Sequence, residues 1–477
     1  MQLQFFNIIN DEERGSEETH AVTDPRTEED LWPCPVATEA DFEDAVAAAQ
    51  KAFPAWSKTT VPERQAALVK LAAILEEHLE ELTDILSKES GKSKLMASFD
   101  IKGSVAQCHY YSTLGLTDEL QYEDEHTRVV ATHVPLGTVG AICPWNFPLI
   151  LSNIKVVSSL VTGNCIIVKP SPFTPYAVMR WIALSRGVLP PGVLQVLNGG
   201  ADLGARMTLH PGIAKISFTG TIATGKRVMA ACATTLKKVT LELAGNDACI
   251  VLPDADLAKT VPSVAAGGFF NAGQVCVASK RIYVHESVFD EFLERLVEEV
   301  ERVYGMQEDA GVPSLFGPVS NRMQYEVVRG IIEDCKRKGY EIKTGGKTEG
   351  VVGKGFWLPA TIVSKPAEDS WLVREEQFGP VLPILSWSDE DDVIKRANLA
   401  NAGLGASVYS RDLAKAERIA RRLETGGVWI NQFERPNMGA FFSGHKDSGF
   451  GGEMGKQGLL SYSYTQCLHF GKDFDKS

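Results

Sequence analysis

One cysteine stands apart from the other eight in the sequence. Cys276 lies in the segment FFNAGQVCVASKR, where a Gly-Gln pair and a valine precede it and a second valine follows. A cysteine thiolate is an intrinsically strong nucleophile, so a cysteine in a glycine-containing segment after a helix-like run could attack an electrophilic carbon. The alternative, for this segment taken alone, is a cysteine that only packs in the core.

Two other residues could supply what such a nucleophile needs. Asn146, in CPWNFPL, directly follows a predicted strand, and its amide could donate to developing negative charge. Glu242 ends the apolar strand of TLELAGNDA, where burial would raise its pKa toward the range of a general base. The alternatives are an asparagine that caps a turn and a glutamate in a structural ion pair.

Three further segments could hold a nucleotide. Lys169 ends a strand in IVKPSPFTP, and Gly220 and Gly225 lead from a strand into a helix in FTGTIATGKRVM, where backbone N–H groups can meet a phosphate. These glycines do not match the GxGxxG pattern. Glu376 precedes Phe378 in REEQFGPVLP, a segment that could also be a plain acidic turn.

The elements that position these residues are short apolar strands that alternate with helices. Such runs, which lack polar alternation, predict a parallel sheet covered on both faces, with ligands at the carboxyl ends of its strands. The first set of runs is VGAIC, CIIVK, VLQVLN, AKISF, KVTLEL and ACIVL, with helices near 149–162, 175–186 and 223–235. A second set follows Cys276, with strands RIYV, ATIV, VLPILSW, ASVYS and GVWIN and helices near 286–304, 322–338, 389–400 and 412–424.

Other segments lie outside these two sets. Leucines at steps of three and four predict one helix over 61–92, with a capping box at Thr60 and Glu63 and a stop at Gly91. The segments 127–134 and 461–470 alternate apolar and polar residues and could pair as a protruding arm. Exposed strands need covering, so the arm predicts oligomerisation.

Composition excludes several classes of function. The 477-residue chain has a net charge of -13, which argues against a nucleic-acid or anionic-membrane binder. Nine cysteines without a CxxC pair argue against zinc and suit a reducing compartment. Neither a secretory signal nor a transmembrane run is recognisable. We expect a cytoplasmic protein with no metal, nucleic-acid or membrane partner.

The order of the motifs is more specific than any one of them. PWNFP, VKPS, FTGT, LEL-G, GQ-C, EE-FGP and SGHKDSGFG together resemble the aldehyde dehydrogenase superfamily over roughly residues 20 to 470. The resemblance implies an α/β fold of two Rossmann-like parallel-sheet domains with a small β-strand oligomerisation arm. It also implies a small-molecule aldehyde substrate, NAD or NADP, and a homodimer or homotetramer.

The resemblance divides the chain into five parts. They are the first part of a cofactor-binding domain (1–116), the first part of the arm (117–136), the second part of the cofactor-binding domain (137–244), a catalytic domain (245–446), and the arm with the C-terminal tail (447–477).

The resemblance also assigns roles. Cys276 would attack the aldehyde to give a thiohemiacetal and then a thioester, Asn146 and the Cys276 N–H would hold the oxyanion, and Glu242 would activate the hydrolytic water. The implied cofactor-binding residues are Pro144, Trp145, Lys169, Ser171, Gly200, Gly220, Thr221, Gly225, Glu376 and Phe378. The implied substrate-binding residues are Phe147, Ile150, Leu151, Ile154, Val275, Val277, Arg435 and Phe442.

Two positions leave specificity open. Many NAD-using members carry a glutamate three residues after the lysine, where this chain has Pro172, so we expect weak discrimination between the cofactors with NAD preferred. Arg435 is either a surface residue paired with Glu434 or a contact for a polar or anionic group of the substrate. The competing functions are a CoA-acylating semialdehyde dehydrogenase, which typically lacks the glutamate, and a non-catalytic protein on the same scaffold.

Overall fold

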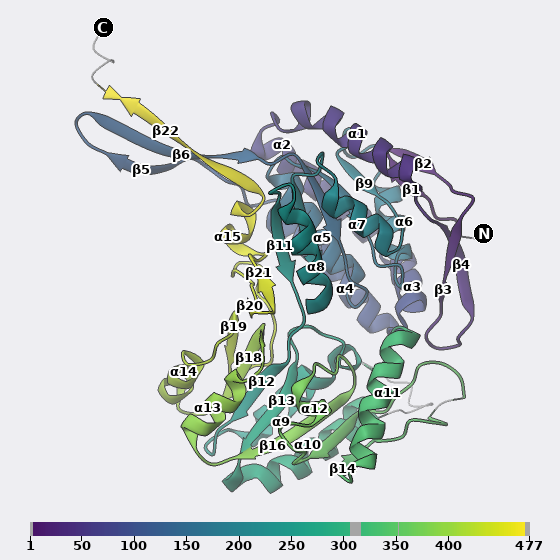
Figure 1. The fold of residues 1–477 in the computed structure, drawn as a ribbon, viewed down its shortest axis with the longest axis vertical. Helices are drawn as coiled ribbons and strands as arrows, with labels where there is room; N and C mark the ends of the chain where they lie inside the picture. The colour runs from purple at the N-terminus through teal and green to yellow at the C-terminus, as the bar shows by residue number, and fades with distance from the viewer. Residues whose placement is uncertain (1–2, 306–315, 352, 473–477) are drawn as a thin grey trace.

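The protein is described by a computed structural model that covers residues 3–305, 316–351 and 353–472. Two sheets form the centres of two lobes, and a long arm of strands projects from the upper lobe (Figure 1). The arrangement of two α/β units and a strand arm predicted from the sequence is confirmed.

The sheet of the upper lobe has a parallel centre and antiparallel edges. Its strands, in spatial order, are β2 (Glu12–Arg14), β1 (Asn7–Ile9), β9 (Leu194–Val196), β8 (Cys165–Lys169), β7 (Thr138–Ile142), β10 (Lys215–Thr219), β11 (Lys238–Glu242) and β21 (Gly449–Phe450). The helices of this lobe are α1 (Glu39–Trp56), α2 (Val61–Glu77), α3 (Leu79–Ser90), α4 (Lys94–Tyr111), α5 (Pro148–Val161), α6 (Tyr176–Leu184), α7 (Ala201–Leu209) and α8 (Ile222–Ala233).

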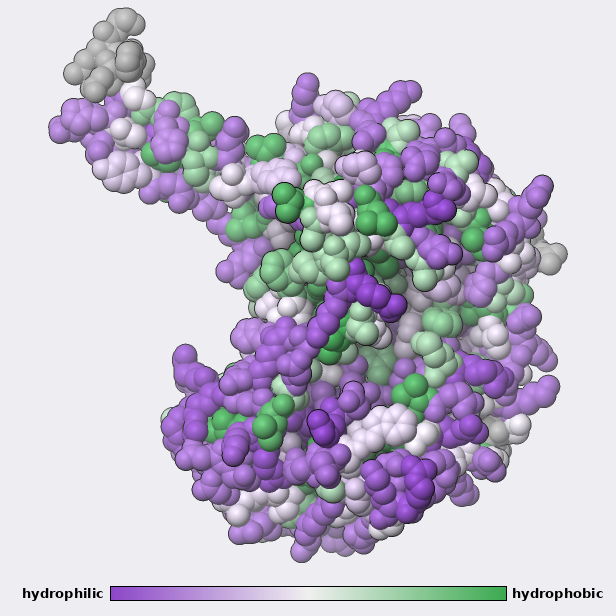
Figure 2. Space-filling view, in the orientation of Figure 1, coloured by the Kyte–Doolittle hydropathy of each residue, from purple (hydrophilic) through white to green (hydrophobic). Residues whose placement is uncertain are grey.

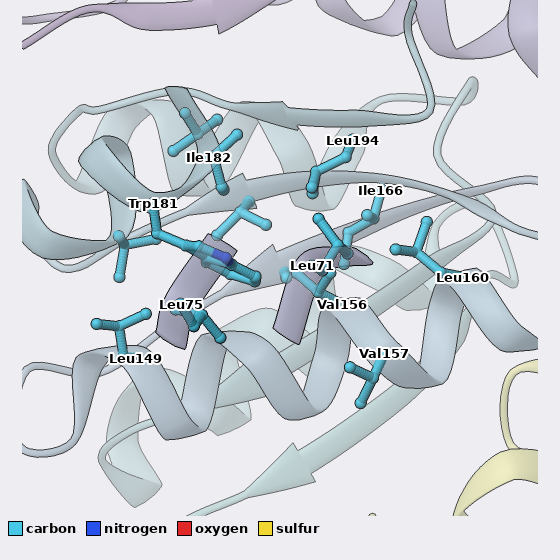
Figure 3. Packing of buried hydrophobic residues seen from close by; sticks show 14 of the residues in the cluster. Leu71, Leu75, Leu149, Val156, Val157, Leu160, Ile166, Trp181, Ile182 and Leu194 are labelled. Carbon is cyan, nitrogen blue, oxygen red and sulfur yellow. The ribbon is translucent and has the colours of Figure 1, made fainter. Parts of the chain in front are cut away.

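Both faces of this sheet are covered, as its continuous apolar strands predict. On β8, Ile166 and Val168 belong to one core, with α5, while Ile167 belongs to another, with α1. Alternate residues of a strand face opposite sides of the sheet, so α1 and α5 cover opposite faces. Figure 3 shows the core on the α5 side, where Leu149, Val156 and Leu160 of that helix lie near side chains of α2, α6 and β8.

The sheet of the lower lobe is parallel except at one edge. Its strands are β14 (Glu341–Thr344), β15 (Thr361–Ser364), β16 (Val381–Trp387), β13 (Ser279–His285), β12 (Asp247–Val251), β18 (Gly405–Tyr409) and β19 (Gly427–Ile430). The helices are α9 (Leu257–Phe269), η1 (Phe270–Gly273), η2 (Glu286–Val288), α10 (Phe289–Tyr304), α11 (Arg322–Arg337), α12 (Trp371–Arg374), α13 (Glu390–Asn398) and α14 (Leu413–Ala420).

The arm is a three-stranded antiparallel sheet. It consists of β22 (Ser463–Gly471), β6 (Thr127–Pro135) and β5 (Glu119–Glu123), and β22 pairs with β6 along its whole length. The pairing of these two segments that the sequence predicts is therefore confirmed. Hydrophobic and hydrophilic residues mix on the surface of the arm (Figure 2), and Tyr464 and Phe470 are about half exposed.

The remaining short elements join these units. They are the hairpin β3 (Thr19–Thr23) and β4 (Asp30–Pro35), the pair β17 (Ala402–Gly403) and β20 (His445–Lys446), and α15 (Gly455–Leu460). Within the described ranges, none of the helices is both long enough and apolar enough to cross a membrane.

Two expectations about elements are wrong. The single helix predicted over 61–92 is two helices, because His78 has a φ of -103° and a ψ of 21°, outside the helical range, and separates α2 from α3. The capping box at Thr60 and the left-handed stop at Gly91 are present. The run ACIVL, assigned to the first set of strands, forms β12 inside the second sheet, between β13 and β18.

Candidate active site

A cavity of about 220 Å³ brings together residues that lie far apart in the sequence. The predicted site residues that line it are Pro144, Trp145, Asn146, Gly220, Thr221, Glu242, Cys276, Glu376 and Phe378. Several of these follow the carboxyl ends of β7, β10 and β11, the edge where parallel sheets place their ligands. Met323, Gln324 and Val327 of α11 also line the cavity, although no sequence motif pointed to them.

A strained turn precedes Cys276 and positions it in this cavity. Asn271, Ala272 and Gly273 have consecutive positive φ values of 52°, 54° and 70°. For residues with a Cβ this conformation is unfavourable and persists only where neighbours hold it. The side-chain amide of Asn271 donates to the carbonyls of Asn146 and Gln274 at 3.3 and 3.2 Å, which fixes the turn.

Asn146 is 3 % exposed and is anchored to the segment that precedes the nucleophile. Its Nδ2 donates to the Gln274 carbonyl at 3.1 Å. A side-chain amide carries two N–H groups, so one donor remains for an oxyanion after this bond is made.

Glu242 is buried beside Cys276 with an incomplete set of hydrogen bonds. The Thr219 hydroxyl donates to its Oε2 at 3.4 Å, whereas Oε1 has no hydrogen-bond partner among the described residues. Burial raises the pKa of Glu242 to about 7, against the opposing effect of the Lys155 ammonium. A carboxylate of that pKa can take and release a proton near neutrality.

Burial also raises the pKa of the Cys276 thiol. The carboxylates of Glu242, Glu376 and Asp247 raise this pKa further, because each disfavours a thiolate nearby. The resting thiol is therefore protonated at neutral pH, and its attack requires a base.

Behind Glu242 lies a buried polar network that the sequence did not reveal. Lys155 Nζ lies 3.3 Å from Glu453 Oε1, and both side chains are at most 1 % exposed. The hydroxyls of Ser217 and Tyr462 donate to Glu453 at 2.6 and 2.9 Å. Although burial opposes it, Glu453 and Glu242 together raise the pKa of Lys155, so the network holds a positive charge near the base. A lysine within the apolar helix NIKVVSSLV was the only sequence signal for it.

Two predicted cofactor-binding residues, Lys169 and Ser171, lie at and just after the end of β8. Lys169 is 5 % exposed, burial lowers its pKa to about 8, and its Nζ donates to the Pro170 carbonyl at 3.4 Å. The Ser171 hydroxyl accepts from the N–H of Phe173 at 3.3 Å. The Pro172 carbonyl lies 2.9 Å from Nε2 of His20, which brings the β3–β4 hairpin against this loop.

The predicted cofactor-binding glycines and Thr221 lie in three places. Gly220 and Thr221 line the cavity at the start of α8, where Thr221 accepts from the Thr224 N–H at 3.3 Å as the helix cap. Gly225 is buried inside α8, and a Cβ there would lie 2.5 Å from the Leu243 side chain, so its place in the structure is a packing contact. Gly200 precedes α7, with open space around it.

Two further predicted cofactor-binding residues, Glu376 and Phe378, lie in a loop against the catalytic segments. The Oε1 atom of Glu376 accepts from the Gly245 N–H at 3.1 Å, and burial raises the pKa of Glu376 to about 8. The ring of Phe378 meets the edge of Trp145 with a centroid distance of 5.2 Å. A helix start and an acidic loop that line the cavity, with a lysine at the end of β8, the strand next to β7, fit a nicotinamide dinucleotide.

The predicted substrate residues do not form one accessible wall. Phe147 is 8 % exposed and stacks on Phe270 at 6.3 Å, while Ile150 lies against Gly103 of α4. Ile154 is 1 % exposed and packs inside the core of the upper lobe. Leu151 is partly exposed.

The other predicted substrate residues come from the lower lobe. Val275 is partly exposed and Val277 is buried, on either side of Cys276, and Phe442 exchanges backbone hydrogen bonds with Glu453. The pairing of Arg435 with Glu434 is wrong, because Glu434 is buried and accepts instead from the Ser279 hydroxyl at 2.8 Å. Arg435 is exposed, and its guanidinium makes no ion pair within the described parts of the chain.

Comparison with known proteins decides the family. The model described as the aldehyde dehydrogenase family matches residues 12–468. The chain belongs to the aldehyde dehydrogenase family. It is 41 % identical to aldehyde dehydrogenase LUC3 of Fusarium sp over 468 residues, which cover 98 % of this chain and 99 % of that protein.

Solved aldehyde dehydrogenases share the fold. The NAD+ complex of the Bacillus cereus enzyme has a TM-score of 0.93 at 33 % identity, covering 98 % of this chain and 97 % of that chain. An Escherichia coli NADP-dependent enzyme has a TM-score of 0.93 at 31 % identity, covering 98 % of each chain. The chain is thus an oxidoreductase that oxidises an aldehyde with a nicotinamide cofactor.

Proposed function

We propose that this aldehyde dehydrogenase works through Cys276, with Asn146 and Glu242 as its partners. Glu242 removes the proton from the Cys276 thiol, and the sulfur attacks the aldehyde carbon to form a thiohemiacetal. Asn146 Nδ2 and the Cys276 backbone N–H donate to the oxygen as it becomes negative. Support comes from the single cavity that Cys276, Glu242 and Asn146 line together.

We propose that the cycle ends with hydrolysis of a thioester on Cys276. Glu242, whose pKa burial raises to about 7, takes a proton from water as the water attacks the acyl carbon. The carboxylic acid leaves and the thiol is restored. The presence of Glu242 beside Cys276 favours water over CoA as the acyl acceptor, so the hydrolytic reaction is preferred to acylation of CoA.

The proposed cofactor contacts come from loops that line the cavity and from the loop after β8. Lys169 and Ser171 would bind the adenosine ribose, Gly220 and Thr221 would face the pyrophosphate, and Glu376 would accept from the nicotinamide ribose. When bound, the nicotinamide accepts the hydride from the thiohemiacetal carbon. Pro172 supplies no carboxylate against a 2′-phosphate, so we propose that NAD and NADP both serve, with NAD preferred.

Replacement of the nucleophile tests this proposal. Cys276→Ala should abolish reduction of NAD by an aldehyde while the melting temperature and the affinity for NAD stay close to those of the wild type. Cys249→Ala, at a buried cysteine of β12, is the matched control and should keep its activity in the folded state. Near-normal turnover by Cys276→Ala would exclude Cys276 as the nucleophile.

We also propose that the arm joins copies of the chain into a cytoplasmic homodimer or homotetramer. Strand β22 lies at the edge of the arm, and Tyr464, Leu468 and Phe470 on it are exposed. An edge strand of nine residues with several exposed apolar side chains is normally covered by another chain. Light scattering after size-exclusion chromatography measures the assembly, and a Leu468→Lys variant should shift it toward the monomer.

A further inference from the structure

Lys280 is a buried cation beside the active site that the proposed mechanism does not use. It stands on β13, four residues after Cys276, and is 0 % exposed. Its Nζ donates to the Gly379 carbonyl at 3.2 Å. Gly379 directly follows Phe378, so Lys280 contacts the loop that is proposed to hold the nicotinamide ribose.

The contact between Lys280 and Gly379 also lies against the turn that precedes Cys276. A Cβ at Gly273 would lie 2.3 Å from the Gly379 oxygen and 2.8 Å from Lys280 Nζ. Gly273 also has a φ of 70°, so both its conformation and its surroundings require glycine. Lys280, the cofactor loop and the nucleophile turn therefore meet at one point.

Carboxylates approach Lys280 from three elements. They are Glu376 of the cofactor loop, Asp247 of β12 and Glu434 of the segment after β19, and all three oppose the effect of burial, which lowers the pKa of Lys280 to about 8. For Glu376 the ammonium of Lys280 is the main influence that opposes burial, followed by the hydrogen bond from Gly245. A charge at this depth acts strongly because the surroundings screen it weakly.

We propose that Lys280 is a positioning residue that fastens the Glu376–Gly379 loop to the Asn271–Gly273 turn, so that binding of the cofactor ribose and the orientation of Cys276 depend on each other. Lys280 holds the loop by its bond to Gly379, and its charge lowers the pKa of the Glu376 carboxyl against the effect of burial. This inference rests on the proposed role of Glu376 in cofactor binding.

The test compares Lys280→Met with Arg281→Met. Arg281 is the next residue of β13, is also buried, and donates to the carbonyls of Asn246 and Ala397 instead of to the Glu376–Gly379 loop. Isothermal titration gives the Kd of NAD between pH 6 and pH 9.5 for each variant. Iodoacetamide gives the alkylation rate of Cys276 with and without saturating NAD, which reports on the orientation of the thiol.

In Lys280→Met we expect the Kd of NAD at pH 7 to rise roughly tenfold and the difference from the wild type to shrink as the pH rises, because Glu376 then ionises only at higher pH. In this variant, adding NAD should no longer change the alkylation rate of Cys276. In Arg281→Met the melting temperature should fall, while the pH profile of binding is unchanged. Lys280→Gln, which removes the charge but keeps an N–H donor, should shift the pH profile in the same way if Lys280→Met does not fold.

The Glu376→Gln variant distinguishes a failure of the Lys280 proposal from a failure of the proposed role of Glu376 in cofactor binding. If Glu376 binds the ribose as proposed, this variant weakens NAD binding, and adding Lys280→Met weakens it little further, because the two residues act together. If Glu376→Gln weakens NAD binding but the pH profile of the Kd of NAD in Lys280→Met superimposes on that of the wild type, the proposed role of Lys280 is wrong. An unchanged Kd in Glu376→Gln would instead overturn the proposed role of Glu376.

Discussion

The side chain of Asn146 and the backbone carbonyl of Gln274 are joined by a hydrogen bond of 3.1 Å, two residues before Cys276. This bond connects the loop after β7 in the upper lobe to the nucleophile segment of the lower lobe. The proposed oxyanion donor and the nucleophile therefore keep a fixed relation although 130 residues separate them in the chain. An oxyanion hole lowers a barrier only when its donors are held in place before the reaction.

Asn146→Ala should lower kcat by roughly 10²–10³-fold, the usual cost of losing one oxyanion donor. Asn153→Ala is the matched control, because Asn153 is an equally buried amide on α5 that donates to Ser104 and Gln107. The control should lose stability but keep its kcat when assayed well below its melting temperature. A decrease of less than about threefold in Asn146→Ala would remove Asn146 from the mechanism.

Glu242→Gln should stop the cycle at the thioester. Mass spectrometry after mixing with aldehyde and NAD should find the acyl group on the peptide that contains Cys276. Rapid steady turnover without a trapped acyl group would mean that another base activates the water.

The pH dependence of the wild type follows from the same residue. Burial raises the pKa of Glu242 to about 7, and only the ionised carboxylate can accept a proton. The hydrolysis rate should therefore rise as the pH increases from 6 to 8 and level off above that range, as measured by decay of the acyl-enzyme in rapid-quench experiments. A rate independent of pH over this interval would contradict the assignment.

The sequence predicted most of the fold because its parallel strands are mainly apolar and buried on both faces. β8 and β16 are examples, since burial on both faces leaves a signal that does not depend on the partner strand. The break at His78 was missed because the leucine spacing continues across it, although one residue between α2 and α3 leaves the helical conformation. The place of β12 was missed because apolar character does not say to which sheet a strand belongs.

The prediction of the site was limited because many of its contacts join residues that are far apart in the sequence. Lys155 and Glu453 are 298 residues apart, and neither position shows by itself that the two form a buried pair behind Glu242. Lys280 resembles any lysine at the start of a strand until the fold brings Gly379 and Gly273 to it. Ile154 has helical spacing to the predicted substrate-binding residues Ile150 and Leu151, yet it packs in the core because α5 is buried on nearly all sides.

Pro172→Glu should weaken NADP selectively, because the new carboxylate would repel a 2′-phosphate and accept from a 2′-hydroxyl. Pro172→Gln introduces a side chain with nearly the shape of glutamate but without its charge. It should leave the ratio of kcat/KM for the two cofactors close to that of the wild type. The contact of His20 with the carbonyl of residue 172 involves the backbone, so both variants can keep it. Steady-state kcat/KM with each cofactor measures the effect. A wild-type preference for NAD above about 10³-fold, over 4 kcal/mol, would contradict the reasoning about this site.

Arg435→Ala tests whether the substrate carries a negative group. The guanidinium of Arg435 is exposed and, in the described parts of the chain, is not paired with Glu434, which lies buried against Ser279. An exposed arginine can bind a carboxylate in a two-point contact that salt weakens. We expect the variant to lower kcat/KM roughly tenfold for an aldehyde with a terminal carboxylate, with a smaller loss at high salt, and to leave a neutral aldehyde of equal length unaffected.

Arg411→Ala, at an exposed arginine beside Asp256, is the control and should affect neither substrate. Equal effects of Arg435→Ala on the two aldehydes would show that Arg435 does not select for charge.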